Sequence, residues 1–181
     1  MIIASAFSPA EAAALLDLSE RQVRKEVEHG LFTTRLNFQS LVYLQALKRL
    51  GVDLGVEDRK KLLVVVDDAV QHGTDTAPLS QVLLVKIGSL VREVRDKVER
   101  FSRWKERLIT DRSILTGEPV FPKSRLAVRH IGTMLERGAS QVEVKEDYPY
   151  LTDEDLEFAP LFVRAYPRVG RPRETRQAPD R

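Results

Sequence analysis

The chain has 181 residues, 43% of them hydrophobic and 31% charged, which is enough apolar material for the core of one globular domain or two small ones. The absence of cysteine excludes disulfides, zinc–thiolate sites and thiol nucleophiles. The net charge is only +2, but residues 125–160 hold eight acidic and four basic residues, whereas six arginines face two carboxylates from Arg164 onward.

The segment over residues 8–32 predicts two short helices joined by a tight turn. Apolar residues at i, i+3 and i+4 give the first helix one buried face, formed by Ala12, Leu15 and Leu16. Two capping boxes, a turn and a terminal glycine delimit the helices: Ser8 with Glu11, Ser19 with Gln22, Asp17-Leu18 and Gly30.

The second helix of this pair has the pattern of a recognition helix. Val23 and Val27 are expected to face inward, and Arg21 and Lys25 fall on the opposite side. Arginine and glutamine can reach base edges, and arginine or lysine can neutralise phosphate. The predicted DNA-binding residues are Ser19, Arg21, Gln22, Arg24, Lys25 and, in the connection that follows, Arg35.

The alternative is a solvated surface helix in a small helical bundle. Glu20, Glu26 and Glu28 lie on the same helix and are counted there as exposed carboxylates.

Further elements are expected up to residue 109. Asn37 can cap a third helix that completes a three-helix core with the first two. Residues 56–71 predict a helix, 72–78 a loop, 79–87 a strand that could pair across a dimer, and 90–109 a long helix. The apolar stripe of that long helix has to be covered by the rest of the chain or by a second copy.

Residues 110–164 predict two short extended pieces followed by three compact helices. This unit resembles another helix-turn-helix, but its last helix begins with carboxylates, at Asp153, Glu154, Asp155 and Glu157. Those charges favour the helix N-terminus and would be repelled by phosphate. The unit is therefore predicted to contact protein or to dimerise.

The segment over residues 165–181 is rich in proline and arginine and cannot bury enough surface to fold alone. It is either a solvated end or an arm that binds an acidic partner. On the second interpretation the contact residues are Tyr166, Arg168, Arg171 and Arg173.

Catalytic and cofactor motifs are not found in the sequence. The histidines at positions 29, 72 and 130 lack paired ligand spacing, and no phosphate-binding glycine loop, dinucleotide fingerprint or nucleophile elbow occurs. We therefore expect no enzyme activity, no metal and no cofactor. The apolar start is too short for a signal peptide, and no stretch reaches the roughly 18 apolar residues of a membrane span, so a cytoplasmic protein without membrane contact is expected.

The predicted fold class is mainly α with a small β component, divided into four segments. These are a helix-turn-helix DNA-binding domain (1–72), a strand and long helix that favour dimerisation (73–109), a trihelical domain (110–164) and an extended tail (165–181).

Two family resemblances add to this prediction. The motif A-A-x-x-L-x-x-S-x-R-x-V-R, within residues 8–50, resembles the DNA-binding region of MerR-type regulators. The runs D-R-S-I-L-T-G-E-P-V-F-P-K-S-R-L-A-V and E-R-G-A-S-Q-V-E-V-K-E-D-Y-P-Y-L-T-D-E-D-L resemble the uncharacterised domain family found in VapB-type antitoxins. That family usually has a G-T-R-I turn where this chain has residues 122–126, and of that turn the arginine, Arg125, is retained.

The resemblance implies an antitoxin of a type II toxin–antitoxin pair. Its toxin would be a PIN-like ribonuclease whose acidic, magnesium-binding site is blocked by an arginine of the antitoxin. Such antitoxins also repress their own promoter, binding inverted repeats as dimers. The alternatives are a MerR-like regulator whose C-terminal half dimerises or senses a ligand and has no toxin partner, or a scaffold protein without a nucleic-acid role.

Overall fold

Short-range hydrogen bonds determine where most helices begin in this computed structural model, which describes residues 6–80 and 83–168. At Ser8, Ser19, Ser140 and Thr152 the cap side chain accepts from the backbone N–H three residues on, and the side chain there accepts from the cap N–H. The Asn37 side chain accepts from the Ser40 N–H. All five predicted caps are therefore confirmed.

The described residues form a mainly helical fold with one two-stranded antiparallel sheet. The helices are α1 (Pro9–Leu16), α2 (Glu20–Glu28), α3 (Phe38–Leu50), α4 (Val56–His72), α5 (Ile87–Glu106), α6 (Val128–Glu136), α7 (Gln141–Asp147) and α8 (Asp153–Ala165). The strands are β1 (Thr76–Pro78) and β2 (Leu84–Lys86), and a 3₁₀ turn spans Leu115–Gly117. None of the described helices combines the length and the apolar character needed to cross a membrane.

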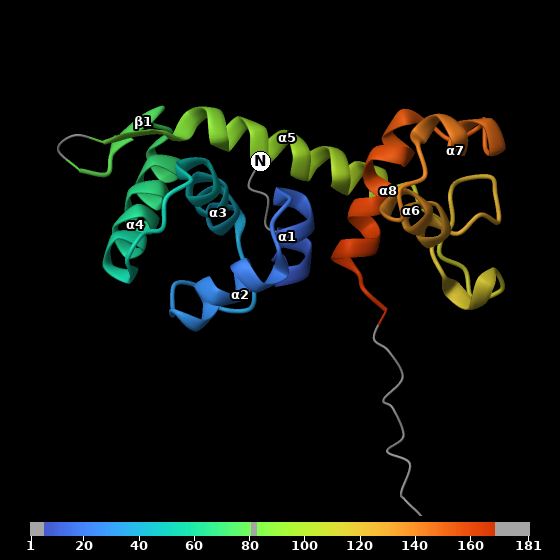
Figure 1. Cartoon of the computed structure of the whole chain (residues 1–181), viewed down its shortest axis with the longest axis horizontal. Helices are drawn as coiled ribbons and strands as arrows, with labels where there is room; N and C mark the ends of the chain where they lie inside the picture. The colour runs from blue at the N-terminus through green and yellow to red at the C-terminus, as the bar shows by residue number, and fades with distance from the viewer. Residues whose placement is uncertain (1–5, 81–82, 169–181) are drawn as a thin grey trace, which may run out of the picture.

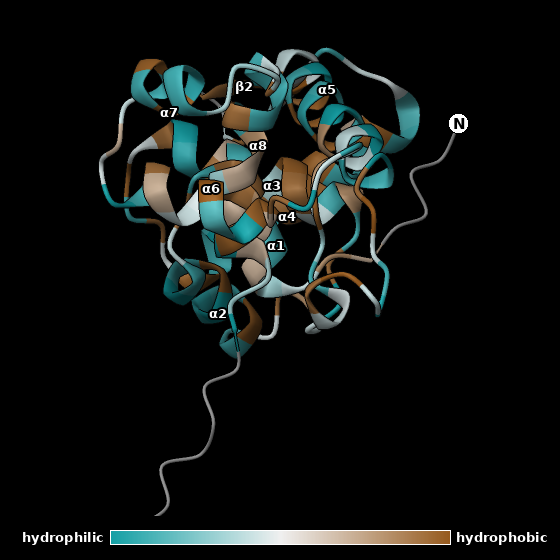
Figure 2. Ribbon diagram, turned by 90° about the vertical axis from the view of Figure 1, so that its right-hand side faces the viewer, coloured by the Kyte–Doolittle hydropathy of each residue, from teal (hydrophilic) through white to brown (hydrophobic). Residues whose placement is uncertain are grey.

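The long helix α5 connects the two halves of the molecule (Figure 1). Helices α1 to α4 and the hairpin lie along its first part, and α6 to α8 gather around its end. Figure 2 shows hydrophobic segments toward the middle of this arrangement and hydrophilic ones on outer turns such as those of α7.

The apolar stripe of α5 is covered by the chain itself. Leu90 and Val94 lie in the half that contacts α3 and α4, and Phe101 and Trp104 pack against Phe158 of α8. Trp104 is buried and its indole N–H donates to the Asp155 carboxylate at 2.8 Å. The packing role predicted for this stripe is therefore met without a second copy.

The strand prediction over residues 79–87 is wrong in its extent. The strand is confined to β2, which pairs with β1 inside the chain, with Thr76 opposite Lys86 and Ala77 opposite Val85. β1 occupies part of the predicted loop. The backbone N–H of Gly88 donates to the Asp75 carbonyl, so α5 begins at Ile87, earlier than the pattern predicts.

Helices α1 and α8 pack against each other, so the segments predicted as separate domains share an interface. Helices α6 and α8 approach closely where α6 has a glycine. A Cβ at Gly132 would lie 2.3 Å from the carbonyl oxygen of Ala159 and 2.6 Å from Val163 Cγ2. The approach of these two helices therefore depends on a residue without a side chain.

Candidate nucleic-acid interface

Helix α2 lies at an outer edge of the N-terminal half, with the connection to α3 beside it (Figure 1). Arg21 and Lys25 are exposed on its outer side, and within the described residues neither has a hydrogen-bond or ion-pair partner. Arg24 is also exposed, but its guanidinium donates to Glu20 at 2.5 Å. The unpaired cations of α2 are therefore Arg21 and Lys25.

Ser19 and Gln22 have a structural role that the sequence prediction separated from DNA binding. The Gln22 side-chain oxygen accepts from the Ser19 N–H and hydroxyl, both at 2.9 Å, and the Ser19 hydroxyl accepts from the Gln22 N–H. Only the amide nitrogen of Gln22 is left to donate to a base. Substitution of either residue therefore changes the helix start as well as any DNA contact.

Arg35 lies in the connection before α3, where its backbone N–H donates to the Thr33 hydroxyl and its carbonyl accepts from it. Its side chain is exposed. The bridge between Phe7 and Leu36 fixes this connection against the start of the chain. Arg35 is therefore placed on an ordered turn, separate from the cations of α2 along the chain.

The inner side of α2 carries a buried carboxylate, which corrects the prediction that Glu26 is a surface charge. Glu26 is 2% exposed, accepts from the Tyr43 hydroxyl at 3.0 Å and forms an ion pair with Arg59. Arg59 also donates to the Leu54 carbonyl and the Asp53 carboxylate, each at 2.7 Å. These bonds tie α2 to α3 and α4.

Burial and the Glu26 carboxylate raise the pKa of the Tyr43 hydroxyl well above its ordinary value. Tyr43 therefore remains a proton donor to Glu26 throughout the ordinary pH range. Removing one member of such a buried group is costly, because the others stay buried without a partner. The orientation of α2 thus depends on three residues that are absent from the predicted site.

Val23 is fully buried as predicted, but Val27 is only partly buried. The side chain of Glu26, three residues after Val23, takes the inward position that the pattern assigns to Val27. On a helical wheel positions 23 and 26 share a side, so this spacing was the available signal for a buried carboxylate.

The carboxylates at the start of α8 are largely paired within the chain. Glu154 accepts from Arg107 at 2.7 Å and Glu157 accepts from Arg100 at 2.5 Å, both from α5. Asp155 is buried against Trp104, and Asp153 pairs with Lys145. The acidic start of α8 therefore serves the joint between α5 and α8, a long-range pairing that sequence spacing did not indicate.

Tyr166, predicted to contact a toxin, is partly buried at the end of α8. Its hydroxyl donates to Glu11 at 2.6 Å and accepts from the Lys105 ammonium at 2.8 Å. Burial and the hydrogen bond to Glu11 raise the pKa of this hydroxyl. Its carbonyl accepts from Arg129. Tyr166 thus connects α8 to α1 and α5.

Arg168 is exposed and donates to Glu118 at 3.0 Å. Burial opposes ionisation of Glu118, but hydrogen bonds from Arg129 and Arg168 together lower its pKa. The other two predicted toxin contacts, Arg171 and Arg173, lie outside the described residues. Of the predicted toxin-binding set, Tyr166 and Arg168 are therefore engaged in contacts within the chain.

A second tie between α8 and α1 lies at the turn before α2. Arg164 donates to the Asp17 carboxylate at 3.1 Å, and Lys48 donates to the Leu16 and Asp17 carbonyls. The hydrogen bond from Arg164 and the charge of Lys48 hold the pKa of Asp17 below its ordinary value. The turn that leads into α2 is therefore held by groups from α3 and α8.

Comparison with known proteins gives few matches. No curated protein matches the chain. The X-ray crystal structure of Rv2018 from Mycobacterium tuberculosis is similar over 87% of this chain and 98% of its own, at 16% identity and a TM-score of 0.34, which is too low to establish a shared fold. Residues 109–163, which contain α6, α7 and most of α8, match the family described as protein of unknown function (DUF433).

Proposed function

We propose that this chain is an antitoxin of a type II toxin–antitoxin system, which represses its own promoter and inhibits a PIN-like ribonuclease toxin. In this proposal α1, the turn at Asp17 and α2 form a MerR-like helix-turn-helix. A second copy supplies the other half of an inverted repeat. The observation that carries DNA binding is the pair of unpaired, exposed cations, Arg21 and Lys25, on a helix anchored from beneath by Glu26.

The geometry suits a reader of the major groove. Exposed cations on one side of a short helix can contact phosphates and base edges, while a buried group on the other side fixes the helix orientation. Arg24, which is paired with Glu20, would have to exchange that partner for phosphate. We therefore assign the main contacts to Arg21 and Lys25, with Arg35 on the adjacent turn.

The DNA test is a titration of DNA from upstream of the chain's own gene, followed by fluorescence anisotropy at several salt concentrations. The variant Arg21→Ala/Lys25→Ala should bind weakly, and its plot of log affinity against log salt should flatten by about two contacts' worth if both residues touch phosphate. The matched control is Lys60→Ala/Lys61→Ala, which removes two charges from the exposed side of α4. Equal losses in the two variants would overturn the assignment to α2.

Toxin inhibition is supported by the family match at residues 109–163 and by the arginine-rich segment that follows. The test is suppression of RNA cleavage by the nuclease encoded next to this chain. A chain that ends at Arg168 keeps every contact described above, so a loss of inhibition would assign the contact to residues 169–181. Unchanged inhibition would place the contact in residues 109–163, and failure of the full chain to inhibit would reject the antitoxin role.

The second candidate is a MerR-like transcription regulator without a toxin partner. It is favoured by a cleft between α1, α3 and α5, close to the turn that leads into α2. This candidate predicts the same loss of DNA binding in Arg21→Ala/Lys25→Ala, but no effect of the chain on RNA cleavage.

A further inference from the structure

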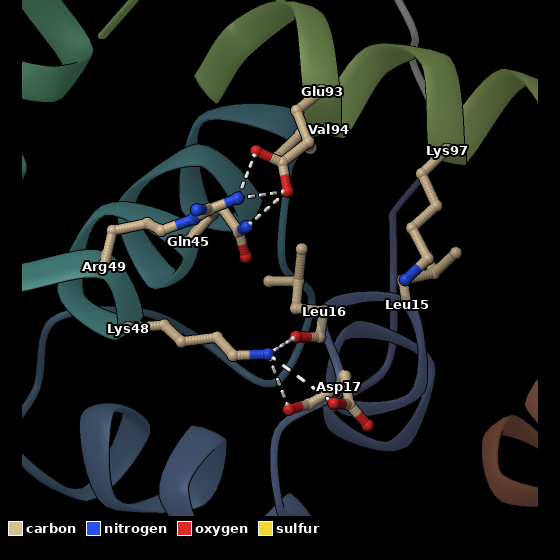
Figure 3. Close-up of a pocket in the computed structure, with 9 residues that line it drawn as sticks. All are labelled: Leu15, Leu16, Asp17, Gln45, Lys48, Arg49, Glu93, Val94 and Lys97. Carbon is tan, nitrogen blue, oxygen red and sulfur yellow. Dashed lines mark hydrogen bonds and ion pairs between the residues drawn. The ribbon is translucent and has the colours of Figure 1, made fainter. Parts of the chain in front are cut away.

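A cleft of about 460 Å³ lies where α1, α3 and α5 meet (Figure 3). Its apolar lining comes from Leu15, Leu16 and Val94. Its polar lining comes from Asp17, Gln45, Lys48, Arg49, Glu93 and Lys97. The cleft is separate from the outer side of α2, so a ligand there would not compete directly with DNA.

The first unusual group in the cleft is the side chain of Gln45. It is 6% exposed, and its amide nitrogen donates to the Glu93 carboxylate at 2.8 Å. Because a carboxylate only accepts, the nitrogen has to face Glu93, which fixes the orientation of the amide. The amide oxygen is then buried with no hydrogen-bond partner among the described residues. A buried acceptor in this state is costly unless a donor reaches it.

The second unusual group is Lys97. In the cleft, Lys48 already donates to the Leu16 and Asp17 carbonyls, and Arg49 donates to Glu93 at 2.9 Å. Lys97 reaches down from α5 toward the Leu15 side of the cleft (Figure 3), and it has no hydrogen bond or ion pair to any residue that the structure describes. Partial burial lowers the pKa of its ammonium. The cleft therefore offers one unpaired cation.

An occupant that satisfies both groups has a definite chemistry. It carries one negative group for Lys97, one hydrogen-bond donor for the Gln45 oxygen, and an apolar body to cover Leu15, Leu16 and Val94. Inorganic phosphate lacks the apolar body, and a fatty acid lacks the donor. A small aromatic or branched organic acid with a hydroxyl or amino group meets all three requirements.

We propose that this cleft is a binding site for a small hydroxy- or amino-substituted organic acid. The acid pairs with the Lys97 ammonium and donates to the Gln45 amide oxygen. This inference is independent of toxin inhibition and extends beyond DNA binding. The ligand would bridge α5 to α1 and α3, and α1 leads through Asp17 into α2.

The probe is 4-hydroxybenzoate, titrated into the full chain by calorimetry. Two analogues test the two contacts, because benzoate lacks the donor and 4-hydroxybenzamide lacks the charge. Each should bind about tenfold more weakly, the order expected when a buried group loses its partner. Equal binding of all three compounds, or no binding of 4-hydroxybenzoate at millimolar concentration, would overturn the proposal.

Two variants assign the contacts to their residues. Lys97→Met keeps the aliphatic stem and should remove the preference for 4-hydroxybenzoate over 4-hydroxybenzamide, whereas Lys60→Met, on the exposed side of α4, should leave it unchanged. Gln45→Met should remove the preference for 4-hydroxybenzoate over benzoate. Thermal unfolding monitored by circular dichroism verifies that each variant is folded. Preferences that survive in both folded variants would place the ligand elsewhere.

Discussion

The hydroxyl of Tyr43 donates to the carboxylate of Glu26 at 3.0 Å, beneath the helix whose outer side carries Arg21 and Lys25. Phe32, from the connection after α2, packs edge-on against the Tyr43 ring at a centroid distance of 5.2 Å. The two contacts link α2, its following connection and α3. The recognition surface that we propose is therefore held from within, by polar and aromatic contacts together.

We expect Tyr43→Phe to destabilise the chain by about 1–3 kcal/mol, because the buried Glu26 carboxylate loses a hydrogen bond while the ring packing is retained. Urea denaturation followed by circular dichroism gives the change in the free energy of unfolding. Tyr150→Phe, at an exposed tyrosine, is the matched control and should change it by less than about 0.5 kcal/mol. Similar values for the two variants would contradict a stabilising role for the Tyr43 hydroxyl.

The ion pair between Glu26 and Arg59 allows a test of how buried charge is tolerated. Glu26→Leu alone should cost about 3–5 kcal/mol, because Arg59 stays buried with its remaining partners at one end only. The double variant Glu26→Leu/Arg59→Met should be destabilised less than Glu26→Leu. A double-mutant cycle in urea measures this coupling. Strictly additive losses would show that the two side chains do not depend on each other.

Features governed by neighbours in sequence were predictable. The caps at Ser8, Ser19, Asn37, Ser140 and Thr152 each need a partner three residues away, and a single sequence contains that information. The exposure of Arg21 and Lys25 follows from the apolar side set by Val23. Helix starts and the outer side of α2 were therefore within reach of pattern and spacing.

Features governed by distant residues were not predictable. Arg59 meets Glu26 across 33 positions, and Arg107 meets Glu154 across 47. Periodicity places a carboxylate on a side of a helix but does not identify which distant cation faces it. For the same reason the acidic start of α8 was interpreted as a surface for another protein, although much of it pairs with α5.

Gln22 provides a way to separate capping from DNA contact. Gln22→Glu can preserve the capping box, and its negative charge suits a helix N-terminus, so stability should be unchanged or slightly higher. The same change removes the amide donor and adds a charge that DNA repels, so binding to promoter DNA should weaken at least about tenfold. Fluorescence anisotropy measures the binding and urea denaturation the stability.

The comparison variant is Gln22→Ala, which loses the cap and should cost about 1 kcal/mol in stability. If Gln22→Glu binds DNA as tightly as the unmodified chain, Gln22 serves the helix start alone and is removed from the proposed interface.

Gly132 allows a prediction that opposes helix propensity. Alanine is normally favoured over glycine within a helix by about 1 kcal/mol, but here a Cβ would overlap the Ala159 carbonyl and Val163. Gly132→Ala should therefore destabilise the packing of α6 on α8 by about 1–3 kcal/mol. Trp104 is the only tryptophan in the chain and packs on α8, so its fluorescence follows this joint during urea denaturation.

Gly55→Ala is the control for that variant, because nothing lies within 4 Å of a Cβ at Gly55. It should change the free energy of unfolding by less than about 1 kcal/mol. Stabilisation by Gly132→Ala would mean that α6 and α8 are farther apart than described.

The contact between Asp17 and Arg164 predicts an acid-dependent loss of stability. The pKa of the Asp17 carboxyl is held below its ordinary value of 3.8, first by the hydrogen bond from Arg164 and then by the charge of Lys48. A lowered pKa in the folded state means that this contribution is complete above the ordinary value and is lost as the pH falls through the lowered one. The advantage of the unmodified chain over Asp17→Asn should therefore be full at pH 6 and shrink below about pH 4.

Asparagine is the suitable replacement because Asp17 has a left-handed backbone conformation, with φ of 52°, which asparagine tolerates. Urea denaturation at several pH values measures the difference, and Asp147→Asn, at an exposed carboxylate that ends α7, serves as the control with a small difference throughout. A difference between the unmodified chain and Asp17→Asn that stays constant, or grows, as the pH falls would mean that Asp17 stabilises the turn through backbone geometry rather than through its charge. In that case Arg164 would not couple α8 to the turn before α2.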